Sequence, residues 1–467
     1  MRKVVLAVLG LSLLQIMGFG RVHALQAGAA AQRSAMVDPA VLARIRDEAL
    51  KSDWSWHQLA GLTDEIGGRL SCSPQLKEAI VRVAATMRSL GARVTLERVK
   101  VPHWVRGAES AELVGYPGKP NGIVQHLAIT ALGGSGATPP SGLTARVLVV
   151  HDLKELRTRA REARGSMVLF ESRFDQHLAD DGYALDAYVQ AAEPRVRGPA
   201  TAAALGAVAV LVRSAGGGEF RLPHTGMTEW KPGQAPIPAG ALAAEDADLI
   251  ERLAARGPVT VKLILTPQTL LDCESSNVIA DWPGREKPGE YVIVSGHLDS
   301  WDLATGATDD GVGVMASAAV IDVLKSLGIH PRRTIRFIAW TNEENGGRGG
   351  RVYLKSVARS LSTQTAAIES DEGAGRPLGV QVADIRDTSA TLQPVLDALR
   401  PLGAAVLSFH EGEVGSDIGP LQRHGVPGFA PLVDMRHYFD YHHSAADTLD
   451  KVDPQDLRRQ VATMAVL

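Results

Sequence analysis

The chain has little cysteine and no surplus of basic residues. Its 467 residues include two cysteines, Cys72 and Cys273, and its 49 lysines and arginines are outnumbered by 52 aspartates and glutamates, which gives a formal net charge of −3. A chain without a basic excess has no field that would hold nucleic acid, so nucleic-acid binding is not expected. Two cysteines far apart in sequence can pair in an exported protein, but we expect two independent buried thiols.

Long apolar runs are absent beyond the first 24 residues. Arg2 and Lys3 open the chain, an apolar run covers residues 4–19, and small residues lie near 22–24. This order is typical of a signal peptide, and the run is short for a membrane-spanning helix of about 20 residues. We therefore expect residues 1–24 to be removed from an exported protein, whether secreted, periplasmic or lumenal, that then has no membrane span.

The length predicts more than one domain, since a single hydrophobic core stops growing at roughly 250–300 residues. Residues 25–110 contain patterns typical of helices. After Ser73-Pro74, for example, apolar residues recur every three or four positions until Gly91, a residue that commonly ends a helix. Residues 111–265 contain short β-like runs separated by Gly and Pro, with one expected helix at 199–205. This change of texture predicts a smaller, β-rich inserted domain.

Strands and helices alternate in residues 266–467. Such alternation predicts an α/β fold with a mostly parallel-centred mixed sheet flanked by helices. The expected elements are strands at 291–295, 334–341 and 366–370 and a helix at 311–327.

Side chains of the metal-ligand type follow each of these expected strands. In open α/β sheets, ligands bind beyond the carboxyl ends of the strands. A buried strand end is a costly place for an unpaired charge, so several charged groups there indicate shared divalent cations. Mixed imidazole and carboxylate ligands suit zinc. The candidate residues are His297, Asp299, Asp309, Glu343, Glu344, Asp371 and His443.

The order of five motifs resembles the co-catalytic zinc aminopeptidase and carboxypeptidase superfamily. The motifs are SGHLDSWD, GATDDGVG, WTNEENGG, ESDEGAG and HHSAADT, and the likeness extends upstream to GGRLSCSP and SSNVIADWPG. Within the superfamily, the sequence is most similar to the branch of carboxypeptidase Q, also called plasma glutamate carboxypeptidase. The resemblance implies a zinc exopeptidase domain in residues 25–110 and 266–467, interrupted by a protease-associated-like module in 111–265.

The resemblance also implies two zinc ions per chain, a shared carboxylate ligand and a glutamate general base. The residue types agree, because a carboxylate can bridge two cations that activate one water, and a second glutamate beside a ligand can accept the proton of that water. The implied roles are His297 and Asp371 for one ion, Glu344 and His443 for the other, Asp309 as the bridge, Glu343 as the base, and Asp299 orienting His297.

One position departs from the resembling family. Many aminopeptidase relatives have a tyrosine immediately before the last histidine ligand, where it helps to hold the oxyanion, and here that residue is His442. We expect His442, Tyr438 or Tyr441 to supply this hydrogen-bond donor. Asp417, in a glycine-rich loop, is expected either to line the substrate pocket or to lie in a surface turn. Asp310 is expected to fix the turn before the next helix.

Together these observations predict an exported two-zinc exopeptidase that cleaves dipeptides or short peptides. An aminopeptidase acting on longer peptides is the nearest alternative, because the sequence does not locate the pocket walls or the anchor for a peptide terminus. A single-zinc acyltransferase of the glutaminyl cyclase type and a non-catalytic receptor-like protein are further alternatives, which the complete ligand set disfavours. Inserted modules of the resembling branch contribute to dimers, so a homodimer is expected.

Overall fold

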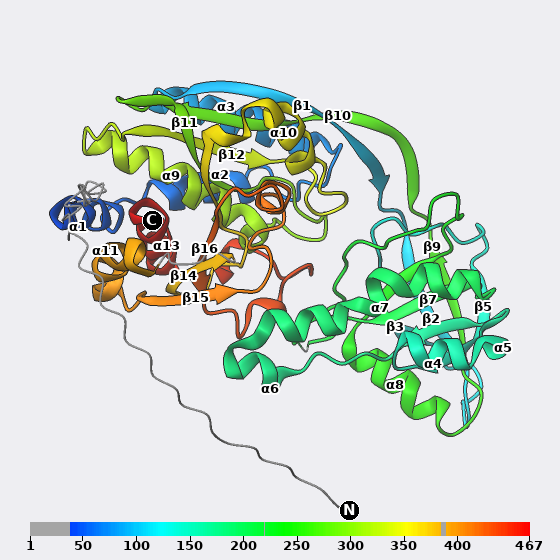
Figure 1. Ribbon diagram of the computed structural model, residues 1–467. Coiled ribbons are helices and arrows are strands. Elements are labelled where there is room, and N and C mark those ends of the chain that lie inside the picture. Colours follow the sequence, from blue (N-terminus) through cyan, green and yellow to red (C-terminus); the bar gives the residue numbers. More distant parts are fainter. Residues whose placement is uncertain (1–37, 219, 384–388) are drawn as a thin grey trace, which may run out of the picture. The chain divides into compact units, whose positions relative to one another are not determined.

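Two eight-stranded sheets organise the protein in a computed structural model that describes residues 38–467 except 219 and 384–388 (Figure 1). Both sheets belong to one unit, Pro39–Leu467. The expected signal peptide, residues 1–24, lies outside the described residues. None of the described helices has the length and the apolar character that a membrane crossing requires.

The first sheet is parallel at its centre and has antiparallel pairings on both sides. Strands β12, β11, β13 and β16 pair in parallel, whereas β10 pairs with β12, and β1 with β10, in antiparallel fashion. Beyond β16, β14 is antiparallel and β15 is parallel to β14. This confirms the predicted sheet. Its order is β1 (Arg93–Val105), β10 (Gln268–Trp282), β12 (Arg333–Trp340), β11 (Lys287–His297), β13 (Gln364–Glu369), β16 (Gly428–Val433), β14 (Pro377–Ala383) and β15 (Val406–His410).

Helices flank this sheet, and two of them, α3 and α9, form where the sequence predicts. α3 begins where the Ser73 hydroxyl accepts a hydrogen bond from the Leu76 amide, and it ends at Gly91, whose φ of 98° favours glycine. α9 is buried on nearly all sides and packs on β11, as an all-apolar helix in a core should. These helices are α1 (Pro39–Ala49), α2 (Trp54–Thr63), α3 (Pro74–Leu90), α9 (Val312–Ser326), α10 (Arg348–Val357), α11 (Ser389–Leu399), α12 (Gly419–Gln422) and α13 (Pro454–Val466).

The second sheet is formed almost entirely by the segment expected to be an insert, 111–265, and β2 begins two residues before it. Short β-like runs of that segment form strands as expected, and three of these strands, β5, β6 and β7, pair in parallel through β6. The strand order is β3 (Gln125–Leu127), β2 (Glu109–Gly115), β9 (Thr260–Leu265), β5 (Leu143–Val150), β6 (Met167–Phe170), β7 (Ala209–Arg213), β8 (Ala239–Leu242) and β4 (Ile129–Ala131).

One helix beside this sheet is much longer than predicted. The expected helix at 199–205 is only the end of α7 (Ala184–Ala204), and Pro199 lies inside it together with Pro194. A proline removes an amide donor, but buried alanines along α7, including Ala191, stabilise the helix by packing. The other helices here are α4 (Leu153–Thr158), α5 (Ala160–Ala163), α6 (Gln176–Leu178) and α8 (Ala244–Ala254).

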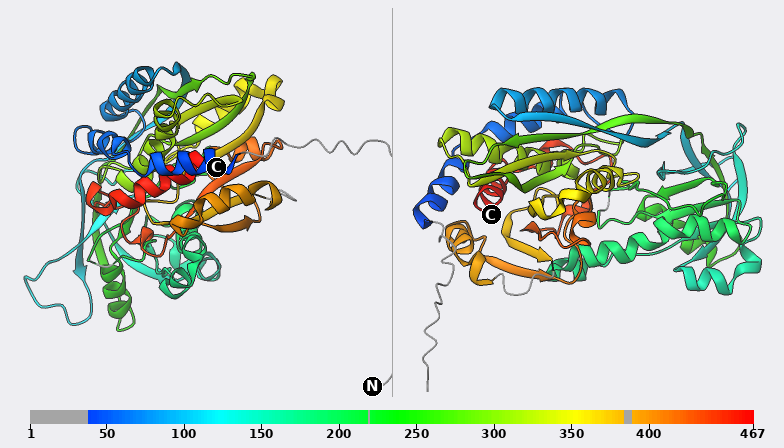
Figure 2. Two further views of the ribbon diagram at one scale, coloured as in Figure 1. Left: turned by 90° about the vertical axis from the view of Figure 1, so that its left-hand side faces the viewer. Right: turned by 45° about the horizontal axis from the view of Figure 1, so that its top comes forward.

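α7 runs from the second sheet to the loop that follows β16 (Figures 1 and 2). There the Tyr188 ring stacks on Phe439, with ring centroids 4.3 Å apart. A second connection is the ion pair between Arg106 and Asp302, with Nη2 and Oδ1 2.7 Å apart. The segment that carries the second sheet therefore contacts residues next to the predicted metal ligands.

The two cysteines form a disulfide, so the prediction of independent thiols is wrong. Cys72 and Cys273 are bonded, with their Cα atoms 5.9 Å apart. Cys273 pairs with Val101 in the β1–β10 ladder, and the Cys72 sulfur lies 3.5 Å from the carbonyl oxygen of Pro102. The long-range pairing of β1 with β10 thus brings together two residues whose distance in sequence suggested no contact.

Candidate metal centre and active site

The predicted ligands gather at the carboxyl edge of the parallel strands, as the position of the motifs implied. Three of them end or follow neighbouring strands, and two lie in the short turns η2 (Ala307–Gly311) and η5 (Tyr438–Asp440) or just beyond them. His297 is the last residue of β11, Glu344 follows β12, Asp371 follows β13, Asp309 lies in η2, and His443 follows η5.

Asp309 joins two groups of these side chains. Its Oδ1 lies 3.0 Å from Nε2 of His297, which is also 3.1 Å from Oδ1 of Asp371. Its Oδ2 lies 3.1 Å from Nε2 of His443, which is also 3.1 Å from Oε2 of Glu344. Each imidazole nitrogen therefore faces two carboxylate oxygens, and one carboxylate is common to both groups.

This donor set fits two divalent cations. Ligand atoms about 2.0–2.2 Å from a tetrahedral zinc ion stand roughly 3.3 Å from one another, close to the nitrogen–oxygen spacings found here. Both groups combine imidazole with carboxylate, the ligands that zinc accepts. The ligand atoms of His297, Asp309 and Asp371 all lie within 4.8 Å of one another. Those of Asp309, His442 and His443 do so as well.

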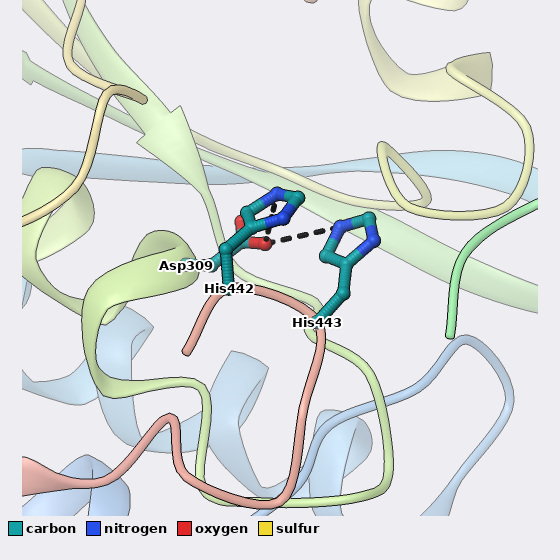
Figure 3. A group of neighbouring side chains, drawn as sticks. All are labelled: Asp309, His442 and His443. Atoms are coloured by element: carbon teal, nitrogen blue, oxygen red, sulfur yellow. Dashed lines mark ion pairs between the residues drawn. The ribbon is translucent and has the colours of Figure 1, made fainter. Parts of the chain in front are cut away.

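Two imidazoles face the same oxygen of Asp309 (Figure 3). Nε2 of His442 lies 3.2 Å from Oδ2, and the His442 ring stacks on His443 with centroids 3.7 Å apart. Only His443 of this pair also has a contact with Glu344 among the described residues. The contact with Glu344 therefore favours His443 as the ligand and leaves His442 beside it.

Asp310 and Asp447 fix the turn that presents Asp309. Oδ2 of Asp310 accepts a hydrogen bond from the His297 amide, and Oδ1 accepts one from the Gly313 amide, both at 3.0 Å. Asp447 accepts hydrogen bonds from the Thr308 amide at 2.7 Å and the Asp309 amide at 3.2 Å. Asp310 thus has the structural position expected of it before α9.

Asp299 contacts His297 through its backbone rather than its carboxylate. Nδ1 of His297 lies 2.9 Å from the Asp299 carbonyl oxygen, while Oδ1 of Asp299 accepts a hydrogen bond from the Glu343 amide at 3.1 Å. Asp299 therefore connects the His297 imidazole to the turn that carries Glu343. The carbonyl contact supports Nε2 of His297 as the ligand atom.

Burial disfavours the ionised form of the carboxyl groups that crowd the site. It raises the pKa of Glu343 to about 7 and the pKa of Glu344 to about 8, and neighbouring carboxylates add to both rises. Burial also favours neutral Asp309, but the surrounding histidines, His442 first, hold the pKa of Asp309 well below its usual range. A bound cation would compensate this crowding of buried carboxyl groups.

A cavity of about 490 Å³ opens on the centre. Glu343, His442 and Tyr438 line it, as does Ser416 from the glycine-rich loop. Of the other predicted pocket residues, Tyr441 and Asp417 are not among the lining residues. Asp417 is buried and accepts a hydrogen bond from the Gly350 amide at 3.3 Å, so it lies neither in a surface turn nor in the pocket wall.

Three residues near the centre were missed by the sequence reasoning. Arg69, in the upstream motif GGRLSCSP, is fully buried and donates hydrogen bonds to four backbone carbonyls, two of them in the turn before Asp309. Tyr188 and Arg195 line the cavity from α7. Arg69 could have been identified from the sequence because it lies in a motif of the resemblance. Nothing in the sequence placed α7 at the site.

A parallel-centred sheet with paired histidine and carboxylate groups at its strand ends defines the class of zinc metallo-exopeptidases. Comparison with known proteins gives the family. Peptidase family M28 matches residues 277–467. Carboxypeptidase Q of Homo sapiens is 37% identical over 88% of this chain and 84% of its own length, and that of Xenopus laevis is 37% identical over 86% and 82%. The chain belongs to peptidase family M28 and is a zinc metallopeptidase.

Solved structures agree with the fold. The peptidase M28 precursor of Shewanella amazonensis SB2B has a TM-score of 0.84 and 36% identity, covering 92% of this chain and 95% of that one. A zinc aminopeptidase of Bacillus subtilis has a TM-score of 0.62 and 22% identity, over 88% and 94%. The similarity to the Shewanella protein extends across both sheets. The similarity to the Bacillus protein, at 22% identity, shows a shared fold alone.

Proposed function

We propose that this protein is an exported exopeptidase that uses two zinc ions to hydrolyse dipeptides or short peptides. The observation that carries the proposal is Asp309, whose two carboxylate oxygens face different histidines, His297 and His443. In two-metal hydrolases a carboxylate so placed holds both cations. The name of the carboxypeptidase Q relatives supports a peptide substrate.

The ions would be held by the two groups that share Asp309. When bound, they supply Lewis acidity, which polarises the scissile carbonyl and makes water acidic near neutral pH. His297 and Asp371 form one group, and Glu344 and His443 the other.

Glu343 would act as the general base. It lines the cavity, and its backbone is held by the hydrogen bond from its amide to Asp299. From there it takes a proton from the attacking water and passes it to the leaving amine. His442 and Tyr438 also line the cavity and are the candidate donors to the oxyanion.

The test is hydrolysis of a dipeptide by residues 25–467, before and after chelation and zinc addition, alongside Glu343→Gln. Loss of a general base typically slows turnover by about 10²- to 10⁴-fold. We expect chelation to abolish cleavage, zinc to restore it, and Glu343→Gln to bind two zinc ions per chain without cleaving. Glu78→Gln, an exposed glutamate of α3, is the matched control. Zinc-loaded protein that cleaves no peptide, or a variant with full activity, would refute the proposal.

The proposed location outside the cytoplasm is supported by the Cys72–Cys273 disulfide, because disulfides persist in oxidising compartments. The N-terminal pattern of residues 1–24 points the same way. Fractionation of cells that express the full chain tests this, and recovery of all the protein with free thiols in the cytoplasm would contradict it.

We also propose that residues 111–265 are a protease-associated-like module and that the protein forms a homodimer. The second sheet, whose strands lie between Glu109 and Leu265, supports the boundaries of the module. Light scattering at micromolar concentration tests the assembly, and a mass of one chain, about 50 kDa, would exclude the dimer.

A further inference from the structure

Arg195 is an arginine of α7 buried in the wall of the active-site cavity. Only 7% of its surface is exposed, and it lines the same cavity as Glu343 and His443. Among the described residues that line this cavity, Arg195 is the only lysine or arginine. Arg197, two residues further on, is by contrast exposed and forms an ion pair with Glu193.

The guanidinium of Arg195 lacks a carboxylate partner. Nη1 donates one hydrogen bond to the Thr225 carbonyl at 3.2 Å, and the buried Nε has no partner within the described part of the chain. No ion pair joins Arg195 to any described acid, although buried arginines are almost always paired. A buried cation left with free donors in a ligand cavity indicates an anionic group that arrives with the ligand.

The surroundings of Arg195 hold its side chain in place. The guanidinium lies over the Tyr188 ring, 5.4 Å from its centroid, and Tyr188 in turn stacks on Phe439. Gly226 allows the backbone to approach, since a Cβ there would lie 2.4 Å from the guanidinium carbon of Arg195. The orientation of the guanidinium is thus fixed before a ligand binds, which lowers the entropic cost of binding.

The position suits the free carboxylate of a short peptide. The Arg195 guanidinium lies 5.4 Å from the centroid of the Tyr188 ring, and that centroid is in turn 4.9 Å from the centroid of His442. Each residue beyond the scissile bond adds at most about 3.6 Å, so only the carboxylate of a very short peptide falls near a group this close to the centre. Apart from Arg195, the tyrosines and the histidines of the metal centre, the ionisable side chains described in this wall are carboxylates, which when charged would repel that terminus.

We propose that Arg195 binds the C-terminal carboxylate of the substrate and so restricts this enzyme to dipeptides and other very short peptides with a free carboxyl end. The inference rests on the proposed peptidase function and names the group that selects its substrate. Arg195 acts in binding and specificity, while the chemistry belongs to the metal centre and Glu343. A bidentate guanidinium–carboxylate contact is the geometry that arginine provides and lysine does not.

Two readouts test the proposal. The first is kcat/KM of the zinc-loaded enzyme for alanyl-alanine and for its C-terminal amide, in wild type, Arg195→Gln, Arg195→Lys and the control Arg197→Gln. The second is calorimetric binding of both compounds to zinc-loaded Glu343→Gln, with and without Arg195→Gln. One charge-assisted hydrogen-bonded contact corresponds to a change of about 10- to 100-fold.

We expect Arg195→Gln to lower kcat/KM and affinity for the acid by that factor, mainly through KM, and to leave the amide unchanged. Arg195→Lys should retain part of the preference, and Arg197→Gln all of it. An equal loss for acid and amide, or no loss, would assign Arg195 a structural role and overturn the proposal. Failure of Glu343→Gln to bind the acid would also overturn it. Absence of turnover in wild type, with carboxylate-dependent binding retained, would instead refute the peptidase proposal alone.

Discussion

Arg69 makes the clearest prediction about how the site is held together. It is fully buried, and its guanidinium donates hydrogen bonds to the carbonyl oxygens of Leu298 at 2.7 Å, Thr305 at 2.5 Å, Gly306 at 2.9 Å and Gly67 at 3.1 Å. Three of these carbonyls lie between β11 and η2, the segment that joins His297 to Asp309. One side chain therefore fixes the connection between two predicted ligands.

We expect Arg69→Met to lower the free energy of unfolding by about 4 kcal/mol, since four buried carbonyls lose their donor at roughly 1 kcal/mol or more each. Burial disfavours the charged guanidinium and lowers the pKa of Arg69 to about 10. This cost of burial offsets part of the stabilisation that the four hydrogen bonds provide in the wild type. Arg69→Lys keeps the charge, but a single ammonium group reaches fewer of the four oxygens, so about half of the loss is expected.

Urea denaturation measures these differences, and zinc content per chain measures the effect on the site. Arg88→Met, on the exposed side of α3, is the control for loss of an arginine. The variants should lose bound zinc in the same order as they lose stability. A midpoint for Arg69→Met equal to that of the control, or full zinc content in a destabilised variant, would refute the claim that Arg69 positions the ligands.

Three further predictions follow from packing and charge. Replacing both cysteines with serine should lower the free energy of unfolding by roughly 2–5 kcal/mol, because the disulfide closes a loop between residues 201 apart; denaturation of the oxidised protein measures this. Gly296→Ala would place a Cβ 2.4 Å from Oδ2 of Asp310, so we expect a cost of about 1–3 kcal/mol and less bound zinc, while Gly289→Ala, with open space, should change neither. Burial lowers the pKa of His224 to about 3 from its ordinary 6.5, so the stability that neutral His224 contributes is present above pH 6.5 and is lost as pH falls toward 3. His224→Gln should flatten that part of a stability profile, and an unchanged slope would contradict this reasoning.

The sheet and the predicted ligands could be inferred from sequence because they depend on local order. A short apolar run predicts a buried strand, and the residue that follows the run lies at the carboxyl end of that strand. This holds whichever position the strand takes in the sheet. His297 at the end of β11 and Asp371 after β13 reach each other because β11 and β13 are parallel neighbours. The resemblance added the roles, which spacing alone does not assign.

The errors share a different cause, which is packing between distant segments. The sequence predicted a helix only at 199–205, but α7 runs through Pro199 because packing along the helix outweighs the missing amide. The disulfide depends on the pairing of β1 with β10, and the contact of His297 with the Asp299 carbonyl depends on how the chain turns after β11. Neither pairing nor turn geometry is encoded in the spacing of the residues concerned.

The substrate pocket is the extreme case of this dependence. The predicted metal ligands in its wall come from strand ends and turns of the first sheet, whereas Tyr188 and Arg195 come from α7, more than one hundred residues earlier in the chain. No local sequence pattern marks Tyr188 and Arg195 as pocket residues, because they reach the cavity only through the contact between α7 and the loop after β16. In this fold, the predicted ligands and the predicted base therefore lie in motifs that can be read along the chain, whereas the residue proposed to select the substrate reaches the cavity only in the assembled structure.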